Sequence, residues 1–162
     1  MRLTNYQRAY FAGFFDGEGS VGIYGVGTSS VSFKCSLCNN DPKPLRLIKK
    51  VYGGYVRLRD RHRLGWQDNY EWTAHSISSA NFLKDIFPYL LIKRQQVLVY
   101  LNARKYVGVG GIGRGLKRST RISAKYKQAS AKLKSLKRPC RLQLTLLTKQ
   151  PRKEHNVSSL YS

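Results

Sequence analysis

Two carboxylates set among glycines, Asp16 and Glu18, end an apolar stretch that begins at Ala9. The stretch is typical of a helix, and the negative end of a helix dipole disfavours a carboxylate by roughly 0.3–1 kcal/mol. A bound divalent cation reverses that preference, and Gly17 and Gly19 leave room for a ligand because they have no Cβ atom. The pattern predicts a metal site at a helix end. An ordinary glycine cap with a solvated glutamate is the alternative.

The net charge indicates a polyanionic partner. Thirty Lys and Arg against eight Asp and Glu give a formal charge of +22, and the chain has no acidic residue between Asp85 and Glu154. Nucleic acid is favoured over a membrane, because no apolar run approaches the roughly 18 residues that span a bilayer and polar side chains separate the basic ones. A ribosomal-type basic protein is the alternative.

The length and the cysteines indicate one domain in a reducing compartment. A chain of 162 residues that is 41% hydrophobic can bury a core without metal or disulfide staples. Cys35 and Cys38 fall on a predicted strand, whose alternation directs their thiols to opposite faces and excludes a shared zinc ion. The thiols therefore indicate an intracellular protein, and the N-terminus has no signal-peptide pattern.

The elements that must position these residues follow the order αββαββα, an α+β fold with helices on one face of an antiparallel sheet. Residues 1–106 form the predicted core. Residues 107–162 form a basic, partly helical extension packed on the same single domain. The expected elements are a helix over Tyr6–Gly17 capped by Asn5, strands over Val21–Thr28 and Ser30–Leu37, a helix from Pro42 to Gly53, strands over Tyr55–Arg61 and Trp66–Ser76, and helices from Ser79 or Asn81 to Pro88 and over Ile92–Tyr106.

Alternating polar residues predict that the uncovered sheet face binds DNA. Side chains spaced by two leave the same side of a strand. Arginine, glutamine and asparagine read base edges, and a two-stranded ribbon fits the major groove. A solvated sheet face is the alternative. The candidate DNA-binding residues are Tyr24, Ser32, Lys34, Arg57, Arg59, Arg61, Gln67, Asn69, Glu71 and Thr73.

A stripe of small residues on the first helix predicts a close helix contact. Ala9, Gly13 and Gly17 recur at intervals of four, which places them on one face and lets two helix backbones approach. The expected partner is the same helix of a second copy, which would bring two Glu18 side chains together beside a cation. A contact within the same chain is the alternative. The expected dimer interface comprises Ala9, Ala12, Gly13, Asp16 and Gly17.

The segment Phe11–Gly19 resembles the nine-residue motif of the LAGLIDADG homing endonucleases, with aromatic residues at three aliphatic positions. The segment Pro88–Gln96 is similar to the family's segment of proline, hydrophobic residues and active-site lysine. Asn40 and Asp41 before a short helix, and the sequence from Gly53 to Arg57, also follow the family pattern. The resemblance covers about residues 5 to 100 and a single motif. It implies a saddle-shaped sheet and a homodimeric enzyme.

The resemblance also implies roles for individual residues. Glu18 takes the position of the catalytic acid and metal ligand, and the Gly17 carbonyl adds a second metal ligand. Asp16 takes the position of the motif's first acid, whose role is mainly structural. Lys93 matches the active-site lysine, and the polar position after the second strand maps to Asn39 or Asn40. Lys43 is a weaker candidate for the basic position on the next helix.

The implied reaction is hydrolysis of one phosphodiester on each strand of a long, imperfectly palindromic DNA duplex, which leaves 3′ overhangs. Mg²⁺ is the expected cofactor, and Mn²⁺ or Ca²⁺ can replace it in binding. An intron RNA maturase or a non-cleaving DNA-binding relative is the alternative, with intron RNA as a further partner. A structural RNA-binding protein is less favoured. The expected location is a DNA-containing compartment, either a prokaryotic cytoplasm or an organelle.

The basic extension is expected to hold the DNA backbone beside the sheet. Lys132 and Lys134 are the chosen candidates within the run Lys117–Arg141. Such lysines contact phosphates and add affinity for any sequence. A solvated basic helix is the alternative.

Overall fold

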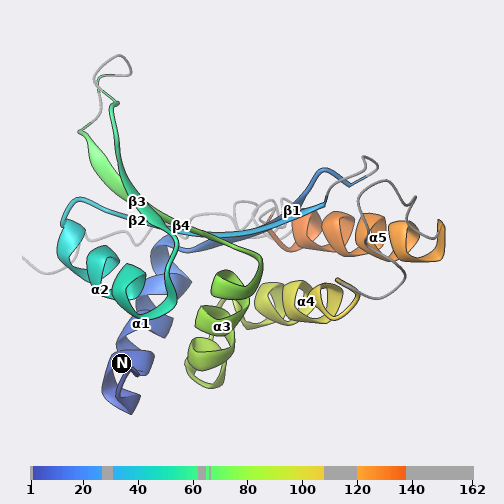
Figure 1. The fold of residues 1–162 in the computed structure, drawn as a ribbon, viewed down its shortest axis with the longest axis horizontal. Helices are drawn as coiled ribbons and strands as arrows, with labels where there is room; N and C mark the ends of the chain where they lie inside the picture. Colours follow the sequence, from blue (N-terminus) through green and yellow to red (C-terminus); the bar gives the residue numbers. More distant parts are fainter. Residues whose placement is uncertain (1, 27–30, 62–64, 66, 108–119, 138–162) are drawn as a thin grey trace, which may run out of the picture.

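The computed structural model describes residues 2–26, 31–61, 65, 67–107 and 120–137 (Figure 1). The expected order of helices and strands is confirmed. The elements are α1 (Asn5–Glu18), β1 (Ser20–Tyr24), β2 (Ser32–Asn39), α2 (Pro42–Tyr52), β3 (Tyr55–Arg59), β4 (Asn69–His75), α3 (Ser76–Ile86), the 3₁₀ turn η2 (Phe87–Tyr89), α4 (Arg94–Arg104) and α5 (Thr120–Lys137).

The four strands form one antiparallel sheet in the order β1-β2-β4-β3. Helices α1 to α4 lie on one side of this sheet, and the other side carries no described helix (Figure 1). The sheet curves so that this uncovered side, called the free face below, is concave (Figure 1). The α+β class and the saddle shape are therefore confirmed.

Local capping explains where the first two helices begin. Thr4 caps α1 with a capping box, in which its hydroxyl accepts from the Gln7 N–H and the Gln7 side chain accepts from the Thr4 N–H. The expected cap, Asn5, is instead the first helical residue, one position later. Asp41 caps α2, which ends at Gly53 with a φ of +77°, a conformation that glycine adopts without strain.

The core lies between the sheet and the helices. Phe33, Cys35 and Leu37 alternate along β2 toward the helices and are buried, as the period of two requires. Trp72 on β4 meets Phe82 on α3 edge to face, with ring centroids 5.0 Å apart. Cys35 is buried on the helix side of the sheet, whereas Cys38, three positions later, lies on the free face. The prediction that the two thiols point to opposite faces is therefore confirmed.

Several element ends differ from the predicted ones. β1 ends at Tyr24 rather than Thr28, since Gly25 follows with a φ of +66°. α3 begins at Ser76, directly after β4 and earlier than expected. α4 begins at Arg94, because the backbone just before it is held by a side chain of α1. The hairpin tips, residues 27–30, 62–64 and 66, lie outside the described residues.

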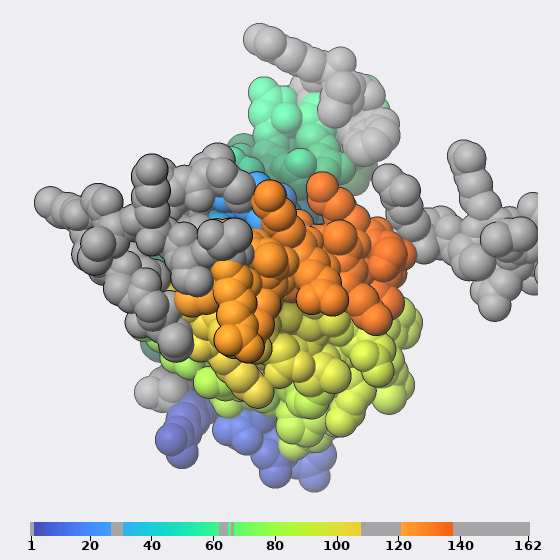
Figure 2. All heavy atoms as spheres, turned by 90° about the vertical axis from the view of Figure 1, so that its right-hand side faces the viewer, coloured from blue at the N-terminus to red at the C-terminus, as the bar shows by residue number. Residues whose placement is uncertain are grey.

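The last described helix, α5, packs on α4 and on β1 (Figure 2). It buries Tyr126 and Leu133 in the common core, and the Tyr126 ring meets Phe33 at a centroid distance of 5.7 Å. The Ser130 hydroxyl donates to the outward carbonyl of Ile23 at 3.2 Å. α5 therefore covers the edge strand of the sheet. None of the described helices is long and apolar enough to cross a membrane.

Candidate active site and DNA-binding face

Glu18 is exposed at the last turn of α1 and lines a small cavity with three asparagines. The cavity has a volume of about 190 Å³, and its lining residues are Glu18, Cys38, Asn39, Asn40 and Asn69. The structure thus brings Asn39, at the end of β2, to the acid that the sequence analysis placed with it. A cavity lined by a carboxylate and amides offers oxygen atoms to a hard cation and N–H donors to a phosphate.

Two of the asparagines at this cavity differ in their hydrogen bonding. The Asn39 Oδ1 atom accepts from the Asp41 N–H at 2.8 Å, which leaves its amide N–H groups as donors. The Asn69 Oδ1 atom is buried, and no donor among the described residues reaches it. A buried carbonyl oxygen without a partner costs free energy, so this atom is a ready acceptor or cation ligand.

Asp16 faces inward and joins α1 to the start of α4. Its carboxylate accepts from the backbone N–H groups of Leu91, Ile92 and Lys93 at 2.8, 3.1 and 2.8 Å. A carboxylate at the N-terminus of a helix is favoured by the helix dipole and satisfies otherwise unpaired donors. With its oxygens occupied and its side chain buried, Asp16 acts as a structural acid.

Lys93 lies against the last turn of α1, next to Glu18. Its ammonium donates to the carbonyls of Phe15 at 3.1 Å and Gly17 at 3.0 Å. Burial lowers the pKa of Lys93, while the negative charges of Asp16 and Glu18 oppose this shift. The Gly17 carbonyl, expected as a metal ligand, is therefore shared with this ammonium, although a carbonyl oxygen has a second lone pair.

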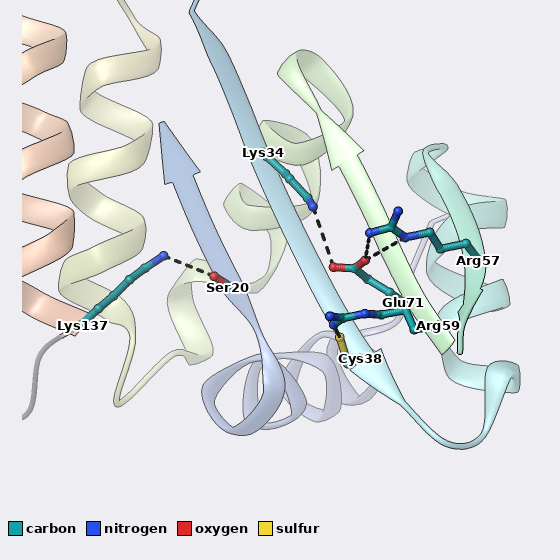
Figure 3. Close-up of polar contacts among 7 residues, drawn as sticks. All are labelled: Ser20, Lys34, Cys38, Arg57, Arg59, Glu71 and Lys137. Carbon is teal, nitrogen blue, oxygen red and sulfur yellow. Dashed lines mark hydrogen bonds and ion pairs between the residues drawn. The ribbon is translucent and has the colours of Figure 1, made fainter. Parts of the chain in front are cut away.

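Lys137 brings a second ammonium to the same region from the end of α5 (Figure 3). It donates to the Ser20 hydroxyl at 3.2 Å and to the Val21 carbonyl. Burial lowers the pKa of Lys137, and the charge of Lys137 adds to the lowering of the pKa of Lys93. Sequence reasoning missed this residue because nothing in the sequence places the end of α5 beside β1.

The free face carries the residues that alternation assigned to it. Cross-strand pairs on this face join Arg57 to Glu71, Arg59 to Asn69 and Tyr55 to Thr73. Tyr24, Ser32 and Lys34 lie on the same side of β1 and β2. Arg61 and Gln67 lie just beyond the ends of β3 and β4. The same face also carries described strand residues that were not proposed, namely Ser20, Gly22, Ser36, Cys38, Tyr55 and His75.

Two predicted base readers are covered on this face, which corrects the prediction. Glu71 is only 5% exposed and Thr73 is fully buried, although both point to the free face. The Glu71 carboxylate forms ion pairs with Arg57 and Lys34 (Figure 3). Alternation identifies the side on which a residue lies, but longer neighbours decide which side chains reach the surface.

The small-residue face of α1 is open. Gly13 and Gly17 are exposed, and a Cβ atom at either position would meet nothing within 4 Å. Ala9 is also exposed. Ala12, expected at the dimer interface, is instead buried in the core of its own chain, as is Asp16 beside α4. Of the residues predicted for a dimer interface, Ala9, Gly13 and Gly17 are therefore the ones that the structure leaves exposed.

Comparison with known sequences decides the family. The family described as LAGLIDADG endonuclease matches residues 11–107, which is more than half of the chain. The chain belongs to the LAGLIDADG endonuclease family. A search of curated protein sequences found no match. The matched segment of this LAGLIDADG endonuclease begins in the motif helix α1 and ends just after α4.

Solved structures share the fold of this LAGLIDADG endonuclease. One of these structures is the homing endonuclease I-CvuI in complex with the I-CreI target, in the presence of Mg and with the DNA not cleaved. It has a TM-score of 0.65 and 20% sequence identity, and the match covers 90% of this chain and 97% of that chain. The archaeal intron-encoded I-Vdi141I complexed with DNA has a TM-score of 0.63 and 15% identity, covering 90% and 96%. I-TnaI has a TM-score of 0.55 and 18% identity, covering 91% and 99%.

The lysines of α5 in the LAGLIDADG endonuclease fall on two sides. Lys134 lines a groove of about 330 Å³ between α5 and β1, together with Tyr24 and Lys137. Lys132 lines a separate hollow between α4 and α5, near Tyr106. The structure therefore separates two residues that the sequence analysis grouped. Only Lys134 lies beside a strand that contributes to the free face.

Proposed function

We propose that the protein is a site-specific DNA endonuclease that acts as a homodimer and hydrolyses one phosphodiester on each strand, leaving 3′ overhangs. The observation that supports this most directly is the exposed carboxylate of Glu18 beside the ammonium of Lys93 and the amides of Asn39 and Asn69. This cluster lies where α1 meets the sheet whose free face is concave and basic. An acid and amide donors around one cavity, with an ammonium on the adjoining helix turn, are the groups that phosphodiester hydrolysis needs.

The oxygen donors at this cavity fit a divalent cation. Glu18 offers an exposed carboxylate at the cavity and Gly17 offers a carbonyl next to it, and Asn69, whose buried Oδ1 atom meets no donor among the described residues, also lines the cavity. These are hard ligands of the kind that Mg²⁺, Mn²⁺ and Ca²⁺ bind. Bound Mg²⁺ lowers the pKa of a water molecule and stabilises the charge of the transition state. Glu18 and Gly17 are the residues proposed to hold it.

The side chains at and beside the cavity would have different roles in the reaction. Lys93 carries a positive charge beside Glu18 and stabilises negative charge on the phosphate, because charge-assisted hydrogen bonds are the strong ones. The amide N–H groups of Asn39 are free to orient a phosphate oxygen or the attacking water. Asp16 keeps the two catalytic segments in register through the backbone of α4.

Two copies are proposed because, in the part of the chain that the structure describes, a single carboxylate, that of Glu18, lines the cavity. The open face of Gly13 and Gly17 permits a second α1 helix to approach closely. Such an approach places one cavity on each side of a two-fold axis, one for each strand. A dimer with this symmetry recognises a duplex that is nearly palindromic.

Substitution of Glu18 by Gln tests the proposed function. The duplex is obtained by selecting from a randomised pool in Ca²⁺, and cleavage of that duplex is then measured in Mg²⁺. We expect Glu18→Gln to lose cleavage by at least a thousandfold and to keep affinity within about threefold, because shape is retained and one ligand charge is lost. Asp60→Asn removes the same charge from the end of β3 and serves as the control. Near wild-type cleavage by Glu18→Gln would remove Glu18 from the site.

An intron RNA maturase is the second candidate. The outer side of α2, on the helical side of the sheet, exposes Lys43, Arg46, Lys49 and Lys50. A basic surface apart from the free face can hold a second polyanion. Specific binding of intron RNA by a protein that cuts no duplex in Mg²⁺ would favour this candidate.

A further inference from the structure

Glu71 occupies the middle of the free face but is almost wholly covered. It lies on β4, opposite Cys38 on β2 and Arg57 on β3, and the side chain of Lys34 reaches it from β2 (Figure 3). Its side chain is 7% exposed, whereas that of Arg57 is 55% exposed. Burying a carboxylate costs free energy unless charged partners form hydrogen bonds or ion pairs with it. The position of Glu71 therefore depends on its contacts with these two cations.

The contact between Glu71 and Arg57 uses one particular edge of the guanidinium group. The Nε and Nη2 atoms of Arg57 donate to Oε2 of Glu71 at 3.0 and 2.6 Å. This pairing occupies the side edge of the planar group. The end edge, formed by Nη1 and the second hydrogen of Nη2, stays free for two parallel hydrogen bonds.

The free edge matches one base. Guanine presents the O6 and N7 acceptors side by side in the major groove, and the paired donors of arginine meet both. A long arginine side chain otherwise samples many rotamers, and ordering it on binding costs free energy. If the guanidinium of Arg57 is already held in place before DNA binds, this ordering no longer reduces the affinity.

We propose that Glu71 is a positioning residue for base recognition: it holds Arg57 so that the end edge of the guanidinium reads guanine, and it makes no base contact of its own. The inference rests on the proposed function, because it requires the free face to lie on DNA. Each subunit of the proposed dimer would read one guanine in this way, at symmetric positions of the two half-sites.

A purely electrostatic role for Glu71 makes a different prediction. Lys34 lies 3.8 Å from the other carboxylate oxygen, and the Arg59 charge also acts on Glu71. If Glu71 only offset repulsion among these cations, its loss would change affinity for every sequence and would act equally with or without Arg57. If Glu71 is a positioning residue, substituting it should change base preference only when Arg57 is present.

Binding-site selection separates these roles. The full-length protein is incubated with a randomised duplex pool in Ca²⁺, and base preferences are read for the wild type, Glu71→Gln, Arg57→Ala and the double variant. We expect Arg57→Ala to lower guanine preference by on the order of ten- to a hundredfold at one position per half-site. Glu71→Gln should lower preference at the same position and not elsewhere. In the Arg57→Ala background, Glu71→Gln should change it no further.

A second variant guards against misfolding of Glu71→Gln. Arg57→Lys keeps the charge and the exposed position but lacks the fork, so it should lose the same guanine preference while its thermal unfolding matches the wild type. Asp60→Asn controls for loss of one negative charge and should keep all preferences. Wild-type guanine preference in Glu71→Gln, or an effect that persists without Arg57, overturns the inference alone. A wild-type protein that selects no sequence overturns the proposed function and the inference together.

Discussion

At the scale of single residues, two acids of one motif take different roles because their surroundings differ. Asp16 accepts three backbone hydrogen bonds and is buried, whereas Glu18, two positions later, is exposed beside Lys93. A helix turns by about 100° per residue, so neighbours two apart face opposite ways. The motif thus holds a buried, hydrogen-bonded acid and an exposed acid within three residues.

Burial is the main cause of the lowered pKa of Lys93, and the charge of Lys137 adds a smaller contribution in the same direction. Because a positive neighbour disfavours the ammonium form, removing Lys137 raises the pKa of Lys93 toward the ordinary lysine value. We expect Lys137→Met to move the NMR titration midpoint of ¹³C-methylated Lys93 to higher pH. The alkaline decline in cleavage should move the same way, since Lys93 acts in its charged form.

The exposed Lys84 on α3 provides the control. Lys84→Met should leave the Lys93 titration unchanged. An unchanged midpoint in Lys137→Met would show that the two ammonium groups do not interact.

Residues whose roles follow from local pattern could be predicted from the sequence. Glu18 was chosen from its place at a helix end, whereas Lys93 and Asn39, with Asn40 as the alternative, were chosen from the resemblance to the family. The structure places Lys93 and both asparagines near Glu18. Glu71 was misjudged as a base reader, because its burial depends on which strand lies on each side of β4. Lys137 was missed, because its position depends on how α5 packs.

At the scale of elements, α1 has two faces with opposite tasks. One face buries Phe11, Ala12 and Phe15 in the core. The other exposes glycine and alanine, with Tyr6 at 90% and Tyr10 at 59% exposed. Exposed aromatic rings beside an open backbone are typical of a protein contact surface.

Gly13→Leu tests whether this face forms the dimer. A Cβ atom added at Gly13 meets no described atom within 4 Å, so we expect the subunit to keep its fold with a leucine there. We expect the sedimentation coefficient to fall to that of a monomer and double-strand cleavage to drop at least a hundredfold. Ala124→Leu, at an exposed position of α5, should remain dimeric. A dimeric, active Gly13→Leu variant would place the interface elsewhere.

Helix α5 presents its lysines to two different surroundings, so their substitutions should differ. Lys134→Ala removes a charge beside Tyr24 and the free face, and we expect the plot of log affinity against log salt to become shallower by about 0.9. Lys132→Ala removes the same charge from the α4 side and should leave the slope unchanged. Titrations of a labelled duplex at several salt concentrations measure both. Equal slopes for the two variants would show that DNA contacts both sides of α5.

At the scale of the whole molecule, α5 completes the core as well as the surface. It covers the outer edge of β1, where unpaired carbonyls would otherwise invite pairing with another chain. Tyr126 reaches Phe33 in the core, and Phe33 also meets Tyr100 of α4 edge to face. The residues outside the family match therefore contribute to the stability of the part inside it.

Tyr126→Ala should destabilise the whole protein by about 3–5 kcal/mol, because it leaves a cavity the size of an aromatic side chain. Urea unfolding at one fixed protein concentration measures the change. Ile77→Ala removes apolar atoms from a position on α3 that is 67% exposed and lies away from the small-residue face of α1, and it should change the free energy of unfolding by less than about 0.5 kcal/mol. A small effect of Tyr126→Ala would show that α5 docks without sharing the core.

The fold could be predicted from sequence as far as local periodicity determines it. The order of helices and strands, the antiparallel hairpins and the polar side of the sheet all follow from alternation and capping residues. The placement of α5 could not be predicted, since its lysines are distributed around the helix and only Tyr126 and Leu133 mark the buried side. The strand order also depends on contacts between distant segments.

The hydrogen bond from the Lys93 backbone N–H to Asp16 can form only after the ribosome has made both residues. The two residues are separated by 77 positions. A ribosome that adds about 5–20 residues per second delivers Lys93 roughly 4–15 seconds after the acidic motif, and Lys137 later still. Closing such a long loop also costs entropy that only a formed core repays. A growing chain therefore carries the acidic motif for some seconds before the backbone that anchors Asp16 has been made.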